Sequence, residues 1–294
     1  MISLTRDWVW KEKLSGYWEL LKPRLSMTVA FSSAFGYILA AGGPIDWIHF
    51  AQFVIGGFFI SGASVTINQL LEIGYDKVMS RTQKRPLPTE RISKSEAIIY
   101  TVLLTIAGSA LLAFATNSLT VLLSLVSLVL YAFVYTPLKR VGPIAVFVGA
   151  IPGALPPLIG WVASTGVISH DALIIFGIQF IWQFPHFWAI AWVSDEDYKR
   201  AGFKLLPGAG KKDLNTAINI VVYTLFLLPL GLLPSYFGLT GIGSGVVATV
   251  CGVLFLAQTF QLLKDNSRKS ALRIMFGSFM YLPVVQIAFL IDKI

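Results

Sequence analysis

The chain has 294 residues, of which 55% are hydrophobic and only 13% are charged, and its formal net charge is +8. Because so few polar residues cannot cover a soluble globule of this size, a water-soluble protein is excluded. The single cysteine, Cys251, excludes an intrachain disulfide and any site built from a cluster of cysteines.

The first 22 residues mix basic, acidic and aromatic side chains and contain no apolar core followed by a small-residue cleavage site. They therefore lack the pattern of a secretory signal peptide. They also lack the Arg- and Ser-rich, acid-poor composition of an organelle transit peptide, which favours a bacterial inner (plasma) membrane. We expect residues 1–24 to form a cytoplasmic segment and residues 25–294 to form a single membrane-embedded domain.

Several segments exceed the ~18 mostly apolar residues that a bilayer crossing requires, and polar connections separate them at regular intervals. They predict an all-α integral membrane protein with about nine transmembrane helices. The expected helices are Leu25–Ala41, Ile48–Leu71, Ala97–Ala115, Leu119–Tyr135, Ile144–Ala163, Ala172–Val193, Thr216–Pro234, Ile242–Leu263 and Leu272–Ile291.

The basic residues alternate between the two sides of this arrangement. All 23 lysines and arginines except Lys293 fall in the N-terminal segment or at every second connection. The positive-inside rule then places the N-terminus in the cytoplasm and the C-terminus outside. Topology thus explains the excess charge, which indicates contact with the lipid bilayer and its anionic headgroups rather than with nucleic acid.

The connection after the second expected helix carries acids at a regular spacing. Asn68, Glu72 and Asp76 recur at every fourth position, so on a continuing helix they would share one face. Two carboxylates and an amide oxygen suit Mg²⁺, and Arg81 and Arg85, which follow, can bind phosphate. Taken singly, each of these charges is more typical of a solvated helix end, and it is the regular spacing followed by the basic segment that favours the metal site.

The connection after the sixth expected helix repeats this order of acids, bases and Leu-Pro. Asp195 and Asp197 follow the apolar helix, and Leu206-Pro207 ends the segment. Asp76 precedes Pro88 by twelve residues, as Asp195 precedes Pro207. Either an internal duplication or chance explains this equal spacing.

Three groups of residues together resemble the UbiA superfamily of intramembrane prenyltransferases, and within it the branch that attaches a farnesyl chain to haem. They are Asn68-x-x-x-Glu72-x-x-x-Asp76 with Met79, Arg81, Thr82, Arg85 and Pro86; Tyr135-Thr-Pro-Leu-Lys139-Arg140; and Trp182-Gln-Phe-Pro-His186-Phe-Trp with Asp197-Tyr198-x-x-Ala-Gly202. Two positions depart from the pattern: Glu72 stands where Asp is usual, and Leu205 where Met is common. Because Glu keeps the charge but adds a methylene, metal geometry can shift while the role survives.

The resemblance implies a UbiA-type helical bundle with a central cavity. It also implies a Mg²⁺-dependent transfer from farnesyl diphosphate to the vinyl group of haem b, which gives haem O and pyrophosphate. Mg²⁺ would be held by Asn68, Glu72 and Asp76, with a second ion at Asp195 or Asp197. The substrate-binding candidates are Arg81, Arg85, Lys139, Arg140 and Tyr198. Haem A synthase or a terminal oxidase would be the expected recipients of the product.

His186 is expected inside the sixth helix, directly after Pro185. An intramembrane histidine is a functional candidate by default, and haem iron or a haem propionate would be its partner. A histidine that is hydrogen-bonded by a neighbouring helix is the alternative.

Two other functions compete with haem farnesylation. A related enzyme could prenylate a quinone precursor, but its second loop would be expected to show a fuller Asp-x-x-x-Asp, whereas positions 199 and 201 are Lys and Ala. A secondary transporter would place charges near the bilayer midplane, whereas nearly all the acids here lie at helix ends.

Overall fold

The computed structural model describes residues 2–294, with side chains for 10–208 and 210–294. Met1 and the side chains of residues 2–9 in the expected cytoplasmic segment therefore lie outside it, as does the side chain of Ala209. In the described part every regular element is a helix, and the only strand-like pairing is one bridge between Thr240 and Lys293. The helices are α1 Ile2–Leu20, α2 Pro23–Ala40, α3 Trp47–Leu71, α4 Ile73–Val78, α5 Lys94–Ala115, α6 Ser118–Val129, the π-helix Leu130–Tyr135, α7 Thr136–Leu138, α8 Ile144–Thr165, α9 His170–Val193, α10 Asp195–Arg200, α11 Pro207–Gly210, α12 Leu214–Tyr236, α13 Ile242–Asp265 and α14 Arg268–Ile291.

Eight spans of the described chain are long and apolar enough to cross a membrane, so this is a multi-pass membrane protein. The expected span Leu25–Ala41 exists as α2, which is not among those eight because Arg24 and its buried serines make it less apolar. It still packs inside the bundle through Phe35, Gly36 and Leu39. The expected all-helical membrane bundle is therefore confirmed.

The helix expected at Leu119–Tyr135 is not a uniform α-helix. It widens into a π-helix at Leu130–Tyr135 and then continues as α7. Pro137 follows at once, and proline cannot donate a backbone hydrogen bond to the preceding turn. The Tyr131 carbonyl accepts two hydrogen bonds from Thr136, one from its backbone amide and one from its hydroxyl at 2.9 Å. This widened turn sets the direction in which Thr136 and Lys139 leave the helix.

Helix α8 stays continuous although Pro152, Pro156 and Pro157 lie inside it. Pro156 and Pro157 cannot donate to the carbonyls of Pro152 and Gly153, four residues earlier. Side chains of neighbouring helices replace those donors: Ser127 donates to Pro152 at 3.4 Å, and Gln179 donates to Gly153 at 2.8 Å. Such replacement is required where no water is present.

Glycines let α2 and α8 touch through their backbones. A Cβ atom at Gly36 would lie 1.9 Å from the Pro157 oxygen, and one at Gly160 would lie 1.9 Å from the Ser33 oxygen. Any larger side chain at either position would therefore force the two helices apart.

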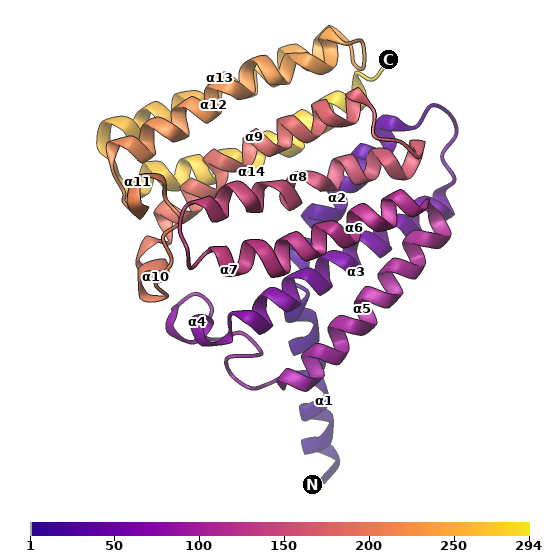
Figure 1. Cartoon of the computed structure of the whole chain (residues 1–294), viewed down its shortest axis with the longest axis vertical. Helices are drawn as coiled ribbons and strands as arrows, with labels where there is room; N and C mark the ends of the chain where they lie inside the picture. The colour runs from indigo at the N-terminus through magenta and orange to yellow at the C-terminus, as the bar shows by residue number, and fades with distance from the viewer. Residues whose placement is uncertain (1) are drawn as a thin grey trace.

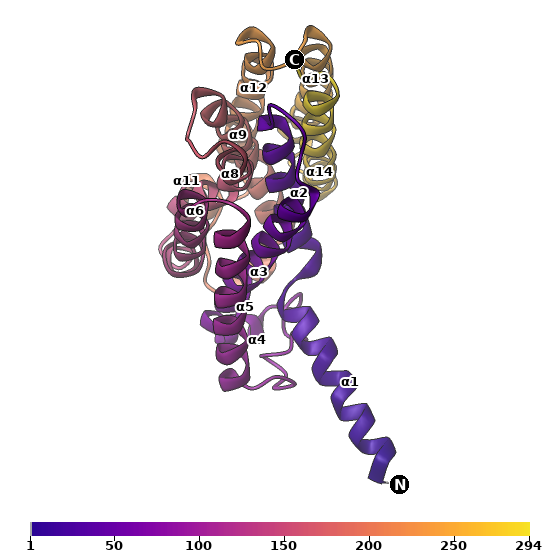
Figure 2. The ribbon, with the colours of Figure 1, turned by 90° about the vertical axis from the view of Figure 1, so that its right-hand side faces the viewer.

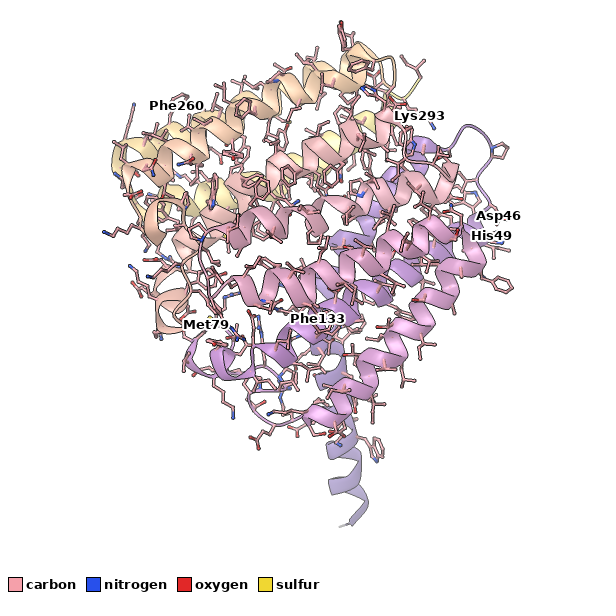
Figure 3. All side chains as sticks on the ribbon, in the orientation of Figure 1. Asp46, His49, Met79, Phe133, Phe260 and Lys293 are labelled. Atoms are coloured by element: carbon pink, nitrogen blue, oxygen red, sulfur yellow. The ribbon has the colours of Figure 1, made fainter. Side chains whose placement is uncertain are left out.

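The two ends of the bundle differ in character. The short helices α4, α10 and α11 gather at one end, and α1 projects away from the bundle (Figures 1 and 2). Asp46, His49 and Lys293 lie at the end opposite to Met79 (Figure 3). The two acid-bearing connections therefore share one end of the molecule.

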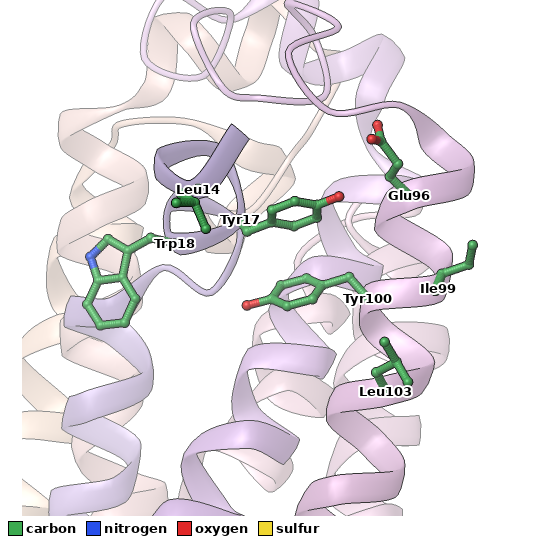
Figure 4. Close-up of a pocket in the computed structure, with 7 residues that line it drawn as sticks. All are labelled: Leu14, Tyr17, Trp18, Glu96, Ile99, Tyr100 and Leu103. Carbon is green, nitrogen blue, oxygen red and sulfur yellow. The ribbon is translucent and has the colours of Figure 1, made fainter. Parts of the chain in front are cut away.

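Two cavities lie apart from the acidic connections. A groove of 580 Å³ between α1 and α5 is lined by Leu14, Tyr17, Trp18, Glu96, Ile99, Tyr100 and Leu103, none of which is a predicted site residue (Figure 4). Lys13 pairs with Glu96 beside it. Between α2, α9 and α14 the structure encloses 10 Å³ next to Gln179 and Gln286, which is too small for a prenyl chain.

Lys293 joins the C-terminus of the chain to the end of α2. Its ammonium group donates to the carbonyls of Ile38 and Ala41, the latter at the C-cap of the helix. We expect Lys293→Met to cost about 1.5–3 kcal/mol, the net value of a hydrogen bond from a charged group. Thermal unfolding in detergent should show a midpoint lowered by about 3–12 °C. Lys269→Met, at an exposed position of α14, is the matched control, and an unchanged midpoint for Lys293→Met would contradict the role.

Candidate functional site

Asn68, Glu72 and Asp76 lie along a helix that bends near Glu72 but keeps its hydrogen bonds between residues four apart. Helix α3 ends at Leu71, and Glu72 is both its C-cap and the residue that precedes α4. The Glu72 amide still donates to the Asn68 carbonyl at 3.1 Å, and the Asp76 amide donates to the Glu72 carbonyl at 2.8 Å. Asn68, Glu72 and Asp76 are all buried, with at most 3% of each exposed. The bend therefore does not turn the acids toward solvent.

A lysine from the turn after α7 neutralises Glu72. The Lys139 ammonium lies 2.9 and 3.0 Å from the two Glu72 carboxylate oxygens. Asn68 donates from one amide nitrogen to Glu72 and to Thr136, each at 3.0 Å. The widened turn before α7 thus brings Thr136 and Lys139 against the end of α3.

Asp76 is neutralised by the loop that follows it. One guanidinium nitrogen of Arg85 lies 2.8 Å from each Asp76 oxygen. The Thr82 hydroxyl donates to the Asp76 carbonyl at 3.0 Å, and the Arg85 amide donates to the Thr82 carbonyl. The loop therefore folds back over α4, and each buried carboxylate has its own cation.

Lys22 belongs to this cluster, although the sequence reasoning used it only as a cytoplasmic charge. It precedes α2 in a left-handed conformation (φ 44°), and its ammonium lies 3.4 Å from the Asn68 side-chain oxygen. Burial, with the nearby charges of Arg85 and Lys139, holds the pKa of Lys22 well below the ordinary lysine value. The available signal was a basic residue directly before Pro23, at the expected membrane boundary.

The second acidic connection makes contacts of two kinds. Asp195 pairs with two lysine side chains, Lys199 at 2.8 Å and Lys212 at 3.3 Å. Asp197 instead accepts hydrogen bonds from the first connection, at Ser80 and Arg81. Burial alone would raise the pKa of Asp197, but these hydrogen bonds and the charge of Arg200 outweigh it and hold the pKa below its usual value.

The remaining predicted binding residues lie around this cluster. Arg140 stacks on the Tyr75 ring at 4.6 Å and donates to the Leu71 carbonyl at the end of α3. Tyr198 and Tyr75 both lie against the Phe203 ring, at centroid distances of 6.3 and 5.2 Å. The Arg81 side chain is exposed.

His186 is not part of the acidic cluster. It is buried in α9, about 13 Å along the helix from Asp195. Its Nδ1 lies 2.7 Å from the Ser278 hydroxyl of α14, and its ring stacks on Trp182 at 4.6 Å. A neighbouring helix thus satisfies one ring nitrogen, as the packing alternative expects.

The cluster has the oxygen donors that Mg²⁺ prefers, but its two carboxylates are paired with basic side chains in this structure. Within the described residues, no three His, Cys, Asp or Glu side chains approach closely enough to hold a metal by themselves. Two carboxylates and one amide oxygen nevertheless fit a magnesium ion that completes its shell with water and phosphate. Three buried or half-buried cations, Lys22, Arg85 and Lys139, face two carboxylates. The excess positive charge favours an anionic ligand.

Known proteins resemble the chain over almost its whole length. The model of the UbiA prenyltransferase family matches residues 29–282. The protoheme IX farnesyltransferase of Cytophaga hutchinsonii is 54% identical, over 96% of this chain and 99% of that one. Among solved structures, digeranylgeranylglyceryl phosphate synthase superposes with a TM-score of 0.79 at 22% identity, over 96% and 98% of the two chains. A UbiA homologue from Archaeoglobus fulgidus bound to DMAPP and Mg²⁺ superposes with a TM-score of 0.67 at 17% identity, over 93% and 99%.

The lowered pKa of Lys22 predicts that this residue destabilises the metal-free protein. Where folding lowers the pKa of a lysine, the unfolded state binds more protons, so stability rises with pH between the folded pKa and about 10.4. We therefore expect Lys22→Met to raise the unfolding midpoint in EDTA, and to do so more at pH 7 than at pH 9.5. Thermal unfolding at both values is the measurement. Lys11→Met, at an exposed position of α1, is the control, and a lowered midpoint for Lys22→Met would contradict the prediction.

Proposed function

Because the chain belongs to the UbiA prenyltransferase family, we propose that it transfers a farnesyl group from farnesyl diphosphate to the vinyl group of haem b. The products are haem O and pyrophosphate. Relatives that match nearly the entire chain and carry the name protoheme IX farnesyltransferase support this choice of substrates. The observation that carries the proposal is the buried cluster of carboxylates and cations at one end of the bundle, where a diphosphate can be bound.

In this proposal Asn68, Glu72 and Asp76 hold Mg²⁺, and Asp195 is the candidate for a second ion. When bound there, the ion would supply positive charge to offset the negative charge that grows on the departing diphosphate. Support comes from the oxygen donors of the cluster and from a protein of the same fold that binds DMAPP and Mg²⁺. Asp195 suits the role because its partners among the described residues are the long, flexible side chains of Lys199 and Lys212.

The cations released from the carboxylates would bind the phosphate oxygens. Lys139 and Arg85 now occupy Glu72 and Asp76, and a metal on those acids would free both side chains. Arg81 and Lys22 lie within the same set of basic residues, while Arg140 and Tyr198 lie at its edge. This exchange keeps Glu72, Asp76, Lys139 and Arg85 paired before and after binding, which avoids the cost of an isolated buried charge at any of the four.

No protein nucleophile is required for the reaction. Once the bond between carbon and the diphosphate oxygen breaks, the allylic cation is attacked by the electron-rich vinyl group of haem. Water then adds to the resulting cation and loses a proton, which leaves a hydroxyethylfarnesyl substituent. The prenyl tail lies in the apolar interior while the diphosphate stays at the membrane surface beside the acids. A haem A synthase or a terminal oxidase is the proposed recipient.

We propose that the protein lies in the bacterial inner membrane with its N-terminus in the cytoplasm and its C-terminus outside. Met79, in the basic connection after α4, lies at the end opposite to Asp46 and His49 (Figure 3), and this separation supports the orientation that the positive-inside rule predicts. We also propose His186 as a haem contact. Its Nδ1 is taken by Ser278, so Nε2 would be the atom that faces haem.

Asp76→Asn should reduce farnesyl transfer by about 100-fold or more, because it weakens both metal binding and neutralisation of the leaving group. The purified protein is incubated with haem b, farnesyl diphosphate and Mg²⁺, and the extracted haem is analysed by mass spectrometry. Circular dichroism checks that the variant is folded. Glu90→Gln, at an exposed position of the same loop, is the control, and near-normal turnover by Asp76→Asn would refute the assignment.

His186→Ala should weaken haem binding by about tenfold or more, a loss of about 1.4 kcal/mol, if the ring contacts haem. Absorbance titration of haem b into the metal-free protein measures this without turnover. Ser278→Ala, which removes the hydrogen-bond partner of Nδ1, is the comparison. If His186 has only a packing role, both variants should lower the unfolding midpoint and neither should change the affinity for haem.

A further inference from the structure

Asp197 is held by the backbone of the other acidic connection. Its Oδ1 accepts from the Ser80 amide at 3.1 Å and from the Ser80 hydroxyl at 2.8 Å, and its Oδ2 accepts from the Arg81 amide at 3.3 Å. An Arg200 nitrogen lies 2.9 Å from Oδ1. Only 8% of the residue is exposed. Both carboxylate oxygens are therefore in use.

The other acids of the site are bound differently. Glu72, Asp76 and Asp195 are each paired with the ends of lysine or arginine side chains, which can rotate away when a metal arrives. The amides of Ser80 and Arg81 are part of the main chain. A metal at Asp197 would leave those two N–H groups without their present acceptor, in a partly buried place where that is costly.

The contact links Asp197 to the first acidic connection. Ser80 and Arg81 directly precede Thr82, whose hydroxyl donates to the Asp76 carbonyl and whose own carbonyl accepts from the Arg85 amide. A continuous path of a few residues thus joins α10 to Asp76 and Arg85, across 117 residues of sequence.

We infer that Asp197 is a positioning residue, which holds the loop carrying Arg81 and Arg85 closed against α10, and that it is not a metal ligand. This inference rests on the proposed function for its kinetic consequences. Without the contact, the loop opens more often, and the basic side chains that would bind farnesyl diphosphate are less often in place. The cost falls on substrate binding, because a site that is closed for only part of the time binds its ligand correspondingly less tightly.

Three variants and a control test this role. Asp197→Asn keeps one acceptor but presents an amide group to the Arg81 N–H, Ser80→Ala removes the hydroxyl donor, and the third variant combines both changes. Glu196→Gln is the control, because it removes one carboxylate charge from an exposed position of the same short helix.

In kinetic assays with haem b, we expect the KM for farnesyl diphosphate to rise about five- to tenfold in Asp197→Asn and about threefold in Ser80→Ala, the range expected for losing one hydrogen bond. The change in kcat should be smaller. The double variant should be little worse than Asp197→Asn, because both changes break the same contact. The Mg²⁺ concentration that gives half-maximal rate should not move in any of them.

A second measurement needs no turnover. Hydrogen exchange of residues 79–86 is followed in the metal-free protein in EDTA. The exchange should be faster in Asp197→Asn and Ser80→Ala than in wild type and in Glu196→Gln. If Asp197→Asn is too unstable to purify, Ser80→Ala alone decides this measurement.

Two results would overturn the inference. A Mg²⁺ requirement shifted by Asp197→Asn, with Ser80→Ala silent, would make Asp197 a metal ligand. Unchanged exchange of residues 79–86 in both variants would show that the contact does not hold the loop. If the wild-type protein forms no farnesylated haem, the proposed function is refuted. The hydrogen-exchange measurement would still test the role of Asp197, because it needs no turnover.

Discussion

The structure depends on pairing charges that have been removed from water. Glu72 and Asp76 lie buried where helices meet the membrane surface, and an isolated charge in such a place costs several kcal/mol or more. Lys139 and Arg85 remove that cost by binding the two carboxylates directly. In the proposed function the two carboxylates bind the metal and the two cations bind the phosphate, and in the absence of ligand the two pairs neutralise each other. A ligand that brings its own cation and anion can replace both pairs without leaving a charge unmatched.

Helix irregularities place these four groups. The π-helix before Pro137 directs Thr136 and Lys139 toward the end of α3, and the bend at Glu72 lets α4 continue past the membrane surface. Helix α8 tolerates its prolines because Ser127 and Gln179 satisfy the carbonyls that the prolines leave free. In lipid these hydrogen bonds must be internal, since no water can replace them. The long packed helices therefore form a rigid support for the end of the bundle that carries the acids, where the backbone departs from regular α-helix.

Two connections far apart in the chain work as one surface at that end. The first carries the metal-binding candidates and the basic loop, and the second supplies Asp195 and the contact from Asp197 to Ser80 and Arg81. In our proposals Asp195 exchanges its lysine partners for a metal, whereas Asp197 holds the first connection in place. Lys22 adds a third segment, from the start of α2, and contributes a cation that the metal-free protein holds at a cost. A site with surplus positive charge before its ligand arrives is suited to a diphosphate.

The sequence by itself determined the membrane class, the approximate helix boundaries, the spacing of Asn68, Glu72 and Asp76, and the family, because hydropathy, helical periodicity and motif spacing are local properties of the chain. Only the tertiary structure decided which partner each polar group takes. Lys139 binds Glu72 across 67 residues, Ser278 of α14 is the hydrogen-bond partner of the His186 Nδ1, and Lys22 joins the site from 46 residues away. These choices follow from which helices pack together and from where proline widens or bends them. Such long-range packing leaves no periodic signal in the sequence.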